Sequence, residues 1–163
     1  MKVLIIYYSK NGTTEKMAKE IERGAKDSGA EVELKNARDA SNDDLIWADG
    51  IIIGSPVYFG MPAAEIKKLF DNSFAARGKL ENKIGAAFAS SHHPTGGKET
   101  TLLAILQSML VHGMIVCGDP LSSGGHYGAA CYDFDERAKK ECYELGKRVA
   151  QLAGKMGAVK DYK

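Results

Sequence analysis

The sequence has few cysteines, no long apolar run and no excess of charge of either sign, and each absence excludes a class of protein. Its three cysteines, Cys117, Cys131 and Cys142, form no Cys-x-x-Cys pair, so an iron–sulfur cluster or a zinc ribbon has no ligand set. Three reduced thiols in a cytoplasmic protein are the expectation instead. No stretch approaches the ~20 apolar residues that a membrane-spanning helix needs.

The charge balance excludes two further classes. The chain carries 22 Lys and Arg residues against 21 Asp and Glu residues, a formal net charge of +1. A protein that binds nucleic acid through its phosphates needs a basic excess, so no nucleic-acid partner is expected. The near-neutral charge also counts against a strongly acidic docking protein.

Size and composition are those of an ordinary globular domain. The chain has 163 residues, of which 44% are hydrophobic and 26% are charged. This length suits one domain with a full core, without a disulfide or metal to stabilise it. We expect a single domain over residues 1–157 and a polar, frayed tail over residues 158–163.

Short apolar runs alternate with amphipathic segments along the chain. The run at residues 3–8 (VLIIYY) is continuously apolar, as in the buried centre of a parallel sheet. Ser41 is the expected N-cap of a short helix, and Pro62 stands at the expected start of another. The alternation predicts a parallel sheet with right-handed crossovers. The expected strands are residues 3–8, 31–35, 51–53, 84–89 and 114–117; the expected helices are residues 13–28, 42–48, 62–70, 100–111 and a last one, with a capping box at 133–136, to about 154.

The loop after the first strand has the composition of an anion site. It places hydroxyls and backbone N–H groups at the positive end of a helix dipole, which favours a phosphate. Neither the Gly-x-Gly-x-x-Gly fingerprint nor a P-loop is present. Ordinary helix capping by Thr13 or Thr14 is the alternative. The loop consists of Ser9, Lys10, Asn11, Gly12, Thr13 and Thr14.

The run from Ile5 to Ile21 (IIYYSKNGTTEKMAKEI) resembles the flavodoxin signature. That signature has two apolar residues, an aromatic, any residue and a Ser or Thr, followed by a small residue and a spaced Thr before the helix. The resemblance implies an α/β, flavodoxin-like three-layer sandwich, a five-stranded parallel sheet (order 2-1-3-4-5) with helices on both faces. It also implies FMN as cofactor, with its phosphate held by the Ser/Thr loop without salt bridges.

In such a sheet the ligand lies at the carboxyl ends of the strands, so the next two strand-end loops are expected to contact the flavin ring. The loop after the third strand offers two aromatic residues, although a hydrophobic plug is the alternative. The loop after the fourth strand offers hydroxyls and N–H groups, and its adjacent histidines lack the further ligands of a metal site. These loops contain Pro56, Val57, Tyr58, Phe59 and Gly60, and Ser90, Ser91, His92, His93, Thr95, Gly96 and Gly97.

Other segments resemble one branch, the WrbA-type NAD(P)H:quinone oxidoreductases and NADPH-dependent FMN reductase-like flavoproteins. These are Gly54-Ser55-Pro56, Phe59-Gly60 and His112-Gly113-Met114. In that branch the Asn11 position also meets the nicotinamide nucleotide, and the His112 position hydrogen-bonds the flavin's pyrimidine end. A helix C-terminal histidine with its bonds satisfied is the alternative for His112. The branch implies a homo-oligomer, a dimer or tetramer, although the short segment 71–83 lacks the insertions of WrbA-type proteins.

The resemblance implies an enzyme that passes two electrons from NAD(P)H through FMN to a quinone or similar acceptor. That chemistry requires no acid–base residue, and His92, His93 and His126 are candidate proton donors. One alternative is a flavodoxin-type one-electron carrier, which typically has strong negative charge and an aromatic on each side of the ring. A flavin-binding or regulatory module without turnover is another.

Overall fold

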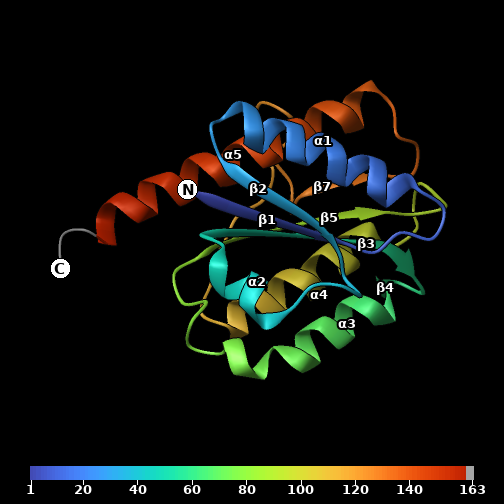
Figure 1. The fold of residues 1–163 in the computed structure, drawn as a ribbon. Helices are drawn as coiled ribbons and strands as arrows, with labels where there is room; N and C mark the ends of the chain where they lie inside the picture. The colour runs from blue at the N-terminus through green and yellow to red at the C-terminus, as the bar shows by residue number, and fades with distance from the viewer. Residues whose placement is uncertain (161–163) are drawn as a thin grey trace.

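The sheet at the centre of the molecule has the expected strand order. A computed structural model describes the backbone of residues 1–160 and the side chains of residues 1–157. The main path of the sheet runs β2-β1-β3-β5-β6 with all neighbours parallel, which confirms the 2-1-3-4-5 order (Figure 1). These strands are β1 (Lys2–Tyr7), β2 (Glu31–Asn36), β3 (Gly50–Tyr58), β5 (Ile84–Ser90) and β6 (Ile115–Val116).

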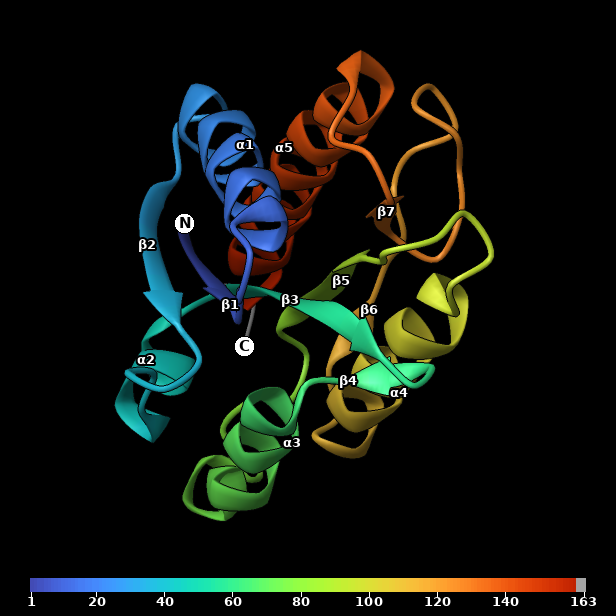
Figure 2. The same ribbon diagram turned by 90° about the vertical axis from the view of Figure 1, so that its right-hand side faces the viewer.

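Helices cover both faces of this sheet, as Figure 2 shows in end view. On one face, α1 and α5 pack over a core that includes Ile5, Ile21 and Val149. On the other, α2, α3 and α4 pack over a core that includes Ile6, Ile53 and Ile105. The helices are α1 (Thr13–Asp27), α2 (Asn42–Trp47), α3 (Ala64–Asp71), α4 (Lys98–Val111) and α5 (Glu136–Lys160), with a 3-10 turn, η1 (Asn72–Ala76), after α3.

The fifth strand is divided, which the sequence did not predict. β6 pairs with the start of β5, and β7 (Ala129–Cys131) pairs with its end, so both continue the same edge. Residues 117–128 leave the sheet between them. The Ala-Ala-Cys sequence of β7 contains no β-branched or aromatic residue, so no strand signal marks it.

The third strand is longer than expected. β3 continues through residues 55–58 and pairs antiparallel with β4 (Met61–Pro62), so the predicted loop is the end of a strand and a tight turn. Pro62 therefore lies in β4 rather than in the helix, which begins at Ala64. The strand can extend because Val57 and Tyr58 are strand-forming residues that follow the glycine at position 54.

The caps of two helices differ in how well the sequence predicted them. Ser41 caps α2 in a reciprocal capping box with Asp44, as expected. At α5, Asp135 is the cap and accepts a hydrogen bond from the N–H of Ala138 at 2.8 Å. A capping box needs a Glu or Gln at the third residue of the helix, where α5 has Ala138, so the predicted box at 133–136 is wrong.

Helix α5 also runs beyond residue 154 to Lys160, so it takes in residues 158–160 of the expected tail. Residues 161–163 of that tail lie outside the described part.

Over the described part of the chain, no helix is both long enough and apolar enough to cross a membrane.

Candidate functional site

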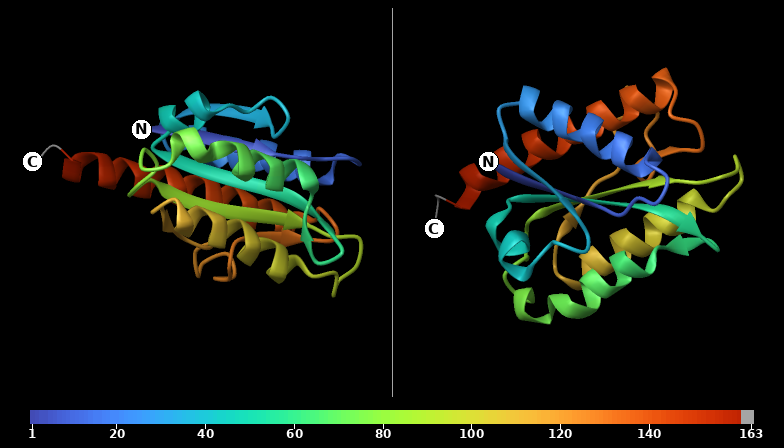
Figure 3. Two further views of the ribbon diagram at one scale, coloured as in Figure 1. Left: turned by 90° about the horizontal axis from the view of Figure 1, so that it is seen from below. Right: turned by 45° about the vertical axis from the view of Figure 1, so that its right-hand side comes forward.

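A cleft of about 300 Å³ lies where the carboxyl ends of β1, β3, β5 and β7 meet. The loops that follow β1 and β5 and the β3–β4 turn gather at this edge, which is on the right in Figure 1 and in both views of Figure 3. The cleft is lined by residues from all three predicted segments and by Tyr132. The predicted residues that line it are Ser9, Lys10, Asn11, Thr13, Thr14, Pro56, Val57, Tyr58, Ser90, Ser91 and His92.

The N-terminus of α1 opens into this cleft. Its N-cap is Gly12, which has no side chain to cap the helix and adopts a φ of 89° that disfavours other residues. The N–H of Gly12 donates to Ser9 Oγ at 3.0 Å, so the loop is closed by its own serine. Thr13 and Thr14 lie inside the first turn and do not cap it. First-turn N–H groups have no intrahelical acceptor, so the site suits a phosphate and the capping alternative is excluded.

Buried hydrogen bonds fix the other walls against this helix. Thr14 Oγ1 lies 2.8 Å from Ser90 Oγ, joining the start of α1 to the end of β5. The N–H of Ser91 donates to the carbonyl of Cys131 at 2.9 Å, joining the β5 loop to the end of β7. Since Tyr132 follows Cys131 directly, this pairing carries Tyr132 into the cleft wall.

The β3–β4 turn presents one of its two aromatics to the cleft. Tyr58 lines the cleft, whereas Phe59 adopts a φ of 52° at the tip and is fully exposed. Phe59 and Gly60 therefore lie outside the cleft, because the tight turn reverses the chain there. The turn is held by Ser55 Oγ, which accepts from the N–H of Ala63 at 2.8 Å, and by Thr100 Oγ1, which donates to the Gly60 carbonyl at 2.7 Å.

The β5 loop divides in the same way. Ser91 and His92 line the cleft, but His93, Thr95, Gly96 and Gly97 form the turn that leads to α4. His93 Nδ1 lies 2.9 Å from Thr95 Oγ1, and the N–H of Gly96 donates to the His93 carbonyl at 3.0 Å. The Nζ of the buried Lys98 donates to the Pro94 carbonyl at 2.5 Å. These residues shape the loop rather than line the cleft.

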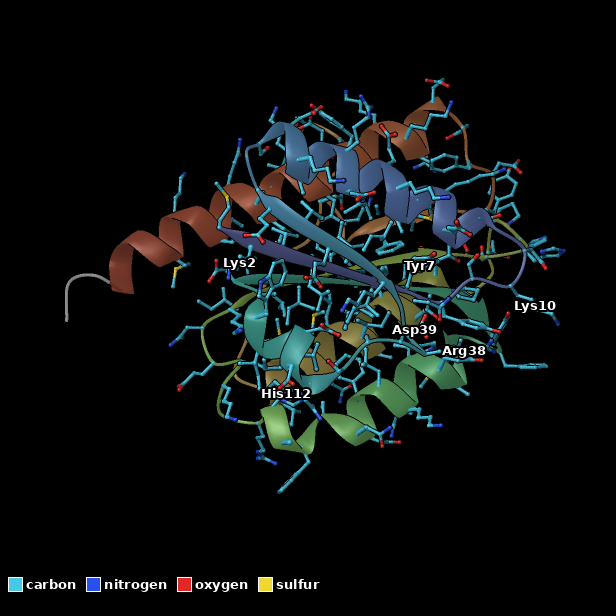
Figure 4. All side chains as sticks on the ribbon, viewed as in Figure 1. Lys2, Tyr7, Lys10, Arg38, Asp39 and His112 are labelled. Atoms are coloured by element: carbon cyan, nitrogen blue, oxygen red, sulfur yellow. The ribbon has the colours of Figure 1, made fainter. Side chains whose placement is uncertain are left out.

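Two predicted histidines lie elsewhere. His112 caps the C-terminal end of α4, and Figure 4 shows it far from Lys10 of the first loop. Its Nε2 lies 2.7 Å from Ser73 Oγ, as expected of a helix-end histidine, but its buried Nδ1 has no hydrogen-bond partner among the described residues, so its bonds are only partly satisfied. Because α4 runs back along the sheet from the cleft, its end lies at the opposite edge. Burial, with a smaller effect of Arg77, lowers the pKa of His112. His126 is exposed on the 117–128 segment and does not line the cleft.

Tyr132 is the one lining residue that the sequence did not predict. The signal that would have found it is its position directly after a strand, at the edge where ligands bind in such sheets. The sequence of that strand, β7, has no recognisable strand pattern, so the position of Tyr132 at a strand end could not be predicted. Tyr132 is 47% exposed, and its ring adds a second aromatic to the cleft.

The cleft carries no negative side chain. Among its lining residues, Lys10 is the basic one and none is Asp or Glu. Tyr58 has a raised pKa because it is partly buried and because Tyr8 and Glu65 lie nearby, so it stays a neutral phenol at physiological pH. Open helix N–H groups, five serine and threonine residues and two aromatic rings fit the phosphate and flat ring of FMN. Among the described side chains, those of residues 1–157, no group of three or more His, Cys, Asp or Glu is placed to hold a metal ion.

Comparison with known proteins agrees with this geometry. Residues 4–110 match the flavodoxin domain family, so the chain belongs to that family. It is 37% identical to a flavodoxin of Aquifex aeolicus, over 92% of this chain and 85% of that protein. It is 34% identical to an NAD(P)H dehydrogenase (quinone) of Archaeoglobus fulgidus, over 95% and 98%. The crystal structure of a flavodoxin, WrbA-like protein from Agrobacterium tumefaciens superposes with a TM-score of 0.76 at 26% identity, over 95% of this chain and 98% of that chain. Family membership implies binding of FMN.

Proposed function

We propose that this protein is an FMN-dependent oxidoreductase that takes two electrons from NAD(P)H and delivers them to a quinone or similar small acceptor. The observation that carries the proposal is the absence of a carboxylate from the cleft lining, where Lys10 is the one basic side chain. An anionic nicotinamide nucleotide can approach such a cleft without repulsion. The relatives named NAD(P)H dehydrogenase (quinone) support the same activity.

The chain's own residues would bind and orient the cofactor. Thr13, Thr14 and Ser9 offer hydroxyls to the phosphate, together with the N–H groups of the first turn of α1. Tyr58 and Tyr132 offer flat surfaces to the ring. Bound FMN supplies the chemistry of accepting a hydride and passing on electrons, while the protein supplies position and electrostatics.

The proposed reaction requires no dedicated acid–base residue, and one of the three candidate proton donors, His92, lines the cleft. His92 is an exposed residue of the cleft lining, so it is positioned to exchange protons with solvent. His93 and His126 do not line the cleft, so their positions give no support for a role as proton donors. His92→Gln should therefore slow turnover in protein that still binds FMN, and an unchanged rate would exclude His92 as the donor.

A one-electron carrier is the second candidate, and one observation favours it. Tyr132 gives the cleft a second aromatic residue, so the case against a carrier cannot rest on a missing aromatic. It rests on charge, because carriers use an acidic face to steer docking, and this chain has a formal net charge of +1. A relative named flavodoxin keeps the carrier as a real competitor.

Steady-state kinetics separates the two candidates. FMN-loaded protein is mixed with NADH or NADPH and menadione, and the oxidation of the nucleotide is followed by absorbance. The enzyme proposal predicts multiple turnovers with at least one nucleotide. No oxidation, combined with two well-separated one-electron midpoint potentials in a redox titration, would establish the carrier instead.

The proposed enzyme is expected to assemble as a dimer or tetramer, as the WrbA-type branch does. Light scattering of the FMN-loaded protein measures this directly, and a monomeric mass would refute it.

A further inference from the structure

A second cavity, of about 640 Å³, lies beside the flavin cleft and shares no lining residue with it. Its walls are the segment between β2 and α2 on one side and helix α3 on the other. This places it on the sheet face that α2, α3 and α4 cover; the left view of Figure 3, seen from below, shows these helices in front of the sheet. Its volume is that of a small-molecule site, yet the cofactor cleft does not explain it.

Contacts between residues at the carboxyl edge of the sheet link the two cavities. Arg38, in the wall of the second cavity, stacks on Tyr8 with its guanidinium carbon 5.0 Å from the ring centre. Tyr8 directly precedes Ser9 of the first loop. Tyr8 and Glu65 also lie close enough to Tyr58 to influence its titration. Figure 4 shows Arg38 and Lys10 on the same edge of the molecule.

The charges in the second cavity favour an anion. Its lining contains two cations, Arg38 and Lys68, and one carboxylate, Glu65. Arg38 Nη2 donates to Glu65 Oε1 at 2.8 Å and lies 3.4 Å from the Tyr8 hydroxyl. Both contacts use one nitrogen of a guanidinium that has five N–H donors, so donors remain for a phosphate. The Arg38 side chain is 63% exposed and can be reached from solvent.

The remaining wall of the cavity suits a nucleoside. Leu69, with neighbouring alanines, supplies an apolar surface for a flat base. The amides of Asn42 and Asn72 and the hydroxyl of Ser41 supply hydrogen-bonding groups. Apolar surface with a few convergent polar groups is the usual composition of a nucleotide-sized site.

We propose that this cavity binds the adenosine 2′-phosphate end of NADPH, with Arg38 and Lys68 holding the phosphate. The inference rests on the proposed function, because a dinucleotide whose nicotinamide reaches the flavin cleft must place its other half nearby. NADH lacks the 2′-phosphate, so the cavity selects NADPH. Glu65 competes with the phosphate for Arg38.

Calorimetric titration of the FMN-loaded protein with adenosine 2′,5′-bisphosphate tests the site without turnover. FMN fills the first cleft, so the probe reports the second. Arg38→Ala should weaken binding about tenfold, which corresponds to about 1.4 kcal/mol, and Lys68→Ala should act in the same direction. Glu65→Gln should tighten binding, because it releases Arg38 from its ion pair. The matched control is Lys67→Ala, since Lys67 pairs with Asp71 away from the cavity and should change affinity less than about twofold.

The outcomes separate this site from the proposed activity. Binding that depends on Arg38 supports the site whether or not NADPH is oxidised, and absence of oxidation then counts against the reductase alone. If NADPH is oxidised but Arg38→Ala leaves both probe affinity and the KM for NADPH unchanged, the reductase stands and this site is refuted. Equal effects of Lys67→Ala and Lys68→Ala, or no binding of the probe to the unmodified protein, also refute it.

Discussion

The hydroxyl oxygens of Thr14 and Ser90 lie 2.8 Å apart in the interior, joining the first turn of α1 to the last residue of β5. The two side chains are 1% and 6% exposed, so water does not compete for this bond. It fixes the open helix N-terminus against the opposite wall of the cleft. The cleft is thus preorganised by residues 76 positions apart in the chain.

The phosphate loop can be tested by removing two of its hydroxyls. Thr13→Ala combined with Thr14→Ala should weaken FMN binding by about 1.5–3 kcal/mol for each charge-assisted hydrogen bond lost. Loss of the bond from Thr14 to Ser90, which holds α1 against the cleft wall, should act in the same direction. Fluorescence titration with FMN measures the affinity. Thr13→Ser with Thr14→Ser keeps both hydroxyls and should restore most of it. Thr95→Ala, outside the cleft, is the control; a double alanine variant that binds like the control would show that FMN phosphate lies elsewhere.

The close approach of α1 and α5 depends on glycine. A Cβ at Gly146 would lie 2.0 Å from the carbonyl oxygen of Ile21, whereas a Cβ at Gly157 of the same helix would meet nothing within 4 Å. Gly146→Ala should therefore destabilise the fold by about 1–3 kcal/mol or more through overpacking. Gly157→Ala should be neutral or stabilising by up to about 1 kcal/mol, because alanine is the better helix former. Urea unfolding of the two variants compares them directly, and equal midpoints would contradict this packing.

The pH dependence of stability should carry a contribution from His112. Burial, and to a lesser extent Arg77, hold its pKa in the folded protein below the ordinary value. The unfolded chain therefore binds more protons at this site, and stability falls as pH drops below about 6.5, the unfolded pKa. His112→Gln should flatten the loss of stability between neutral and acidic pH. A His112→Gln variant with the same slope as the unsubstituted protein would exclude His112 as the source.

The sequence predicted the parts of this molecule whose signals are local. The run from Ile5 to Ile21 carries its own strand, loop and helix pattern, and the strand order followed from its resemblance to flavodoxins. Tyr132 and β7 were missed because pairing with β5, rather than side-chain preference, makes Ala129–Cys131 a strand. The exposed position of Phe59 at the tip could not be foreseen, because the direction of a side chain at a tight turn depends on the turn geometry. The position of His112 at the far end of α4 could not be derived locally, because helix length decides which edge of the sheet that end reaches.

The proposed reductase activity is tested most directly by mixing the FMN-loaded protein with NADPH under anaerobic conditions and recording the flavin absorbance. We expect rapid and complete loss of the oxidised flavin absorbance, and its return when menadione is added. An oxidised spectrum that persists with both NADPH and NADH, in protein that dithionite reduces fully, would contradict the proposed oxidoreductase.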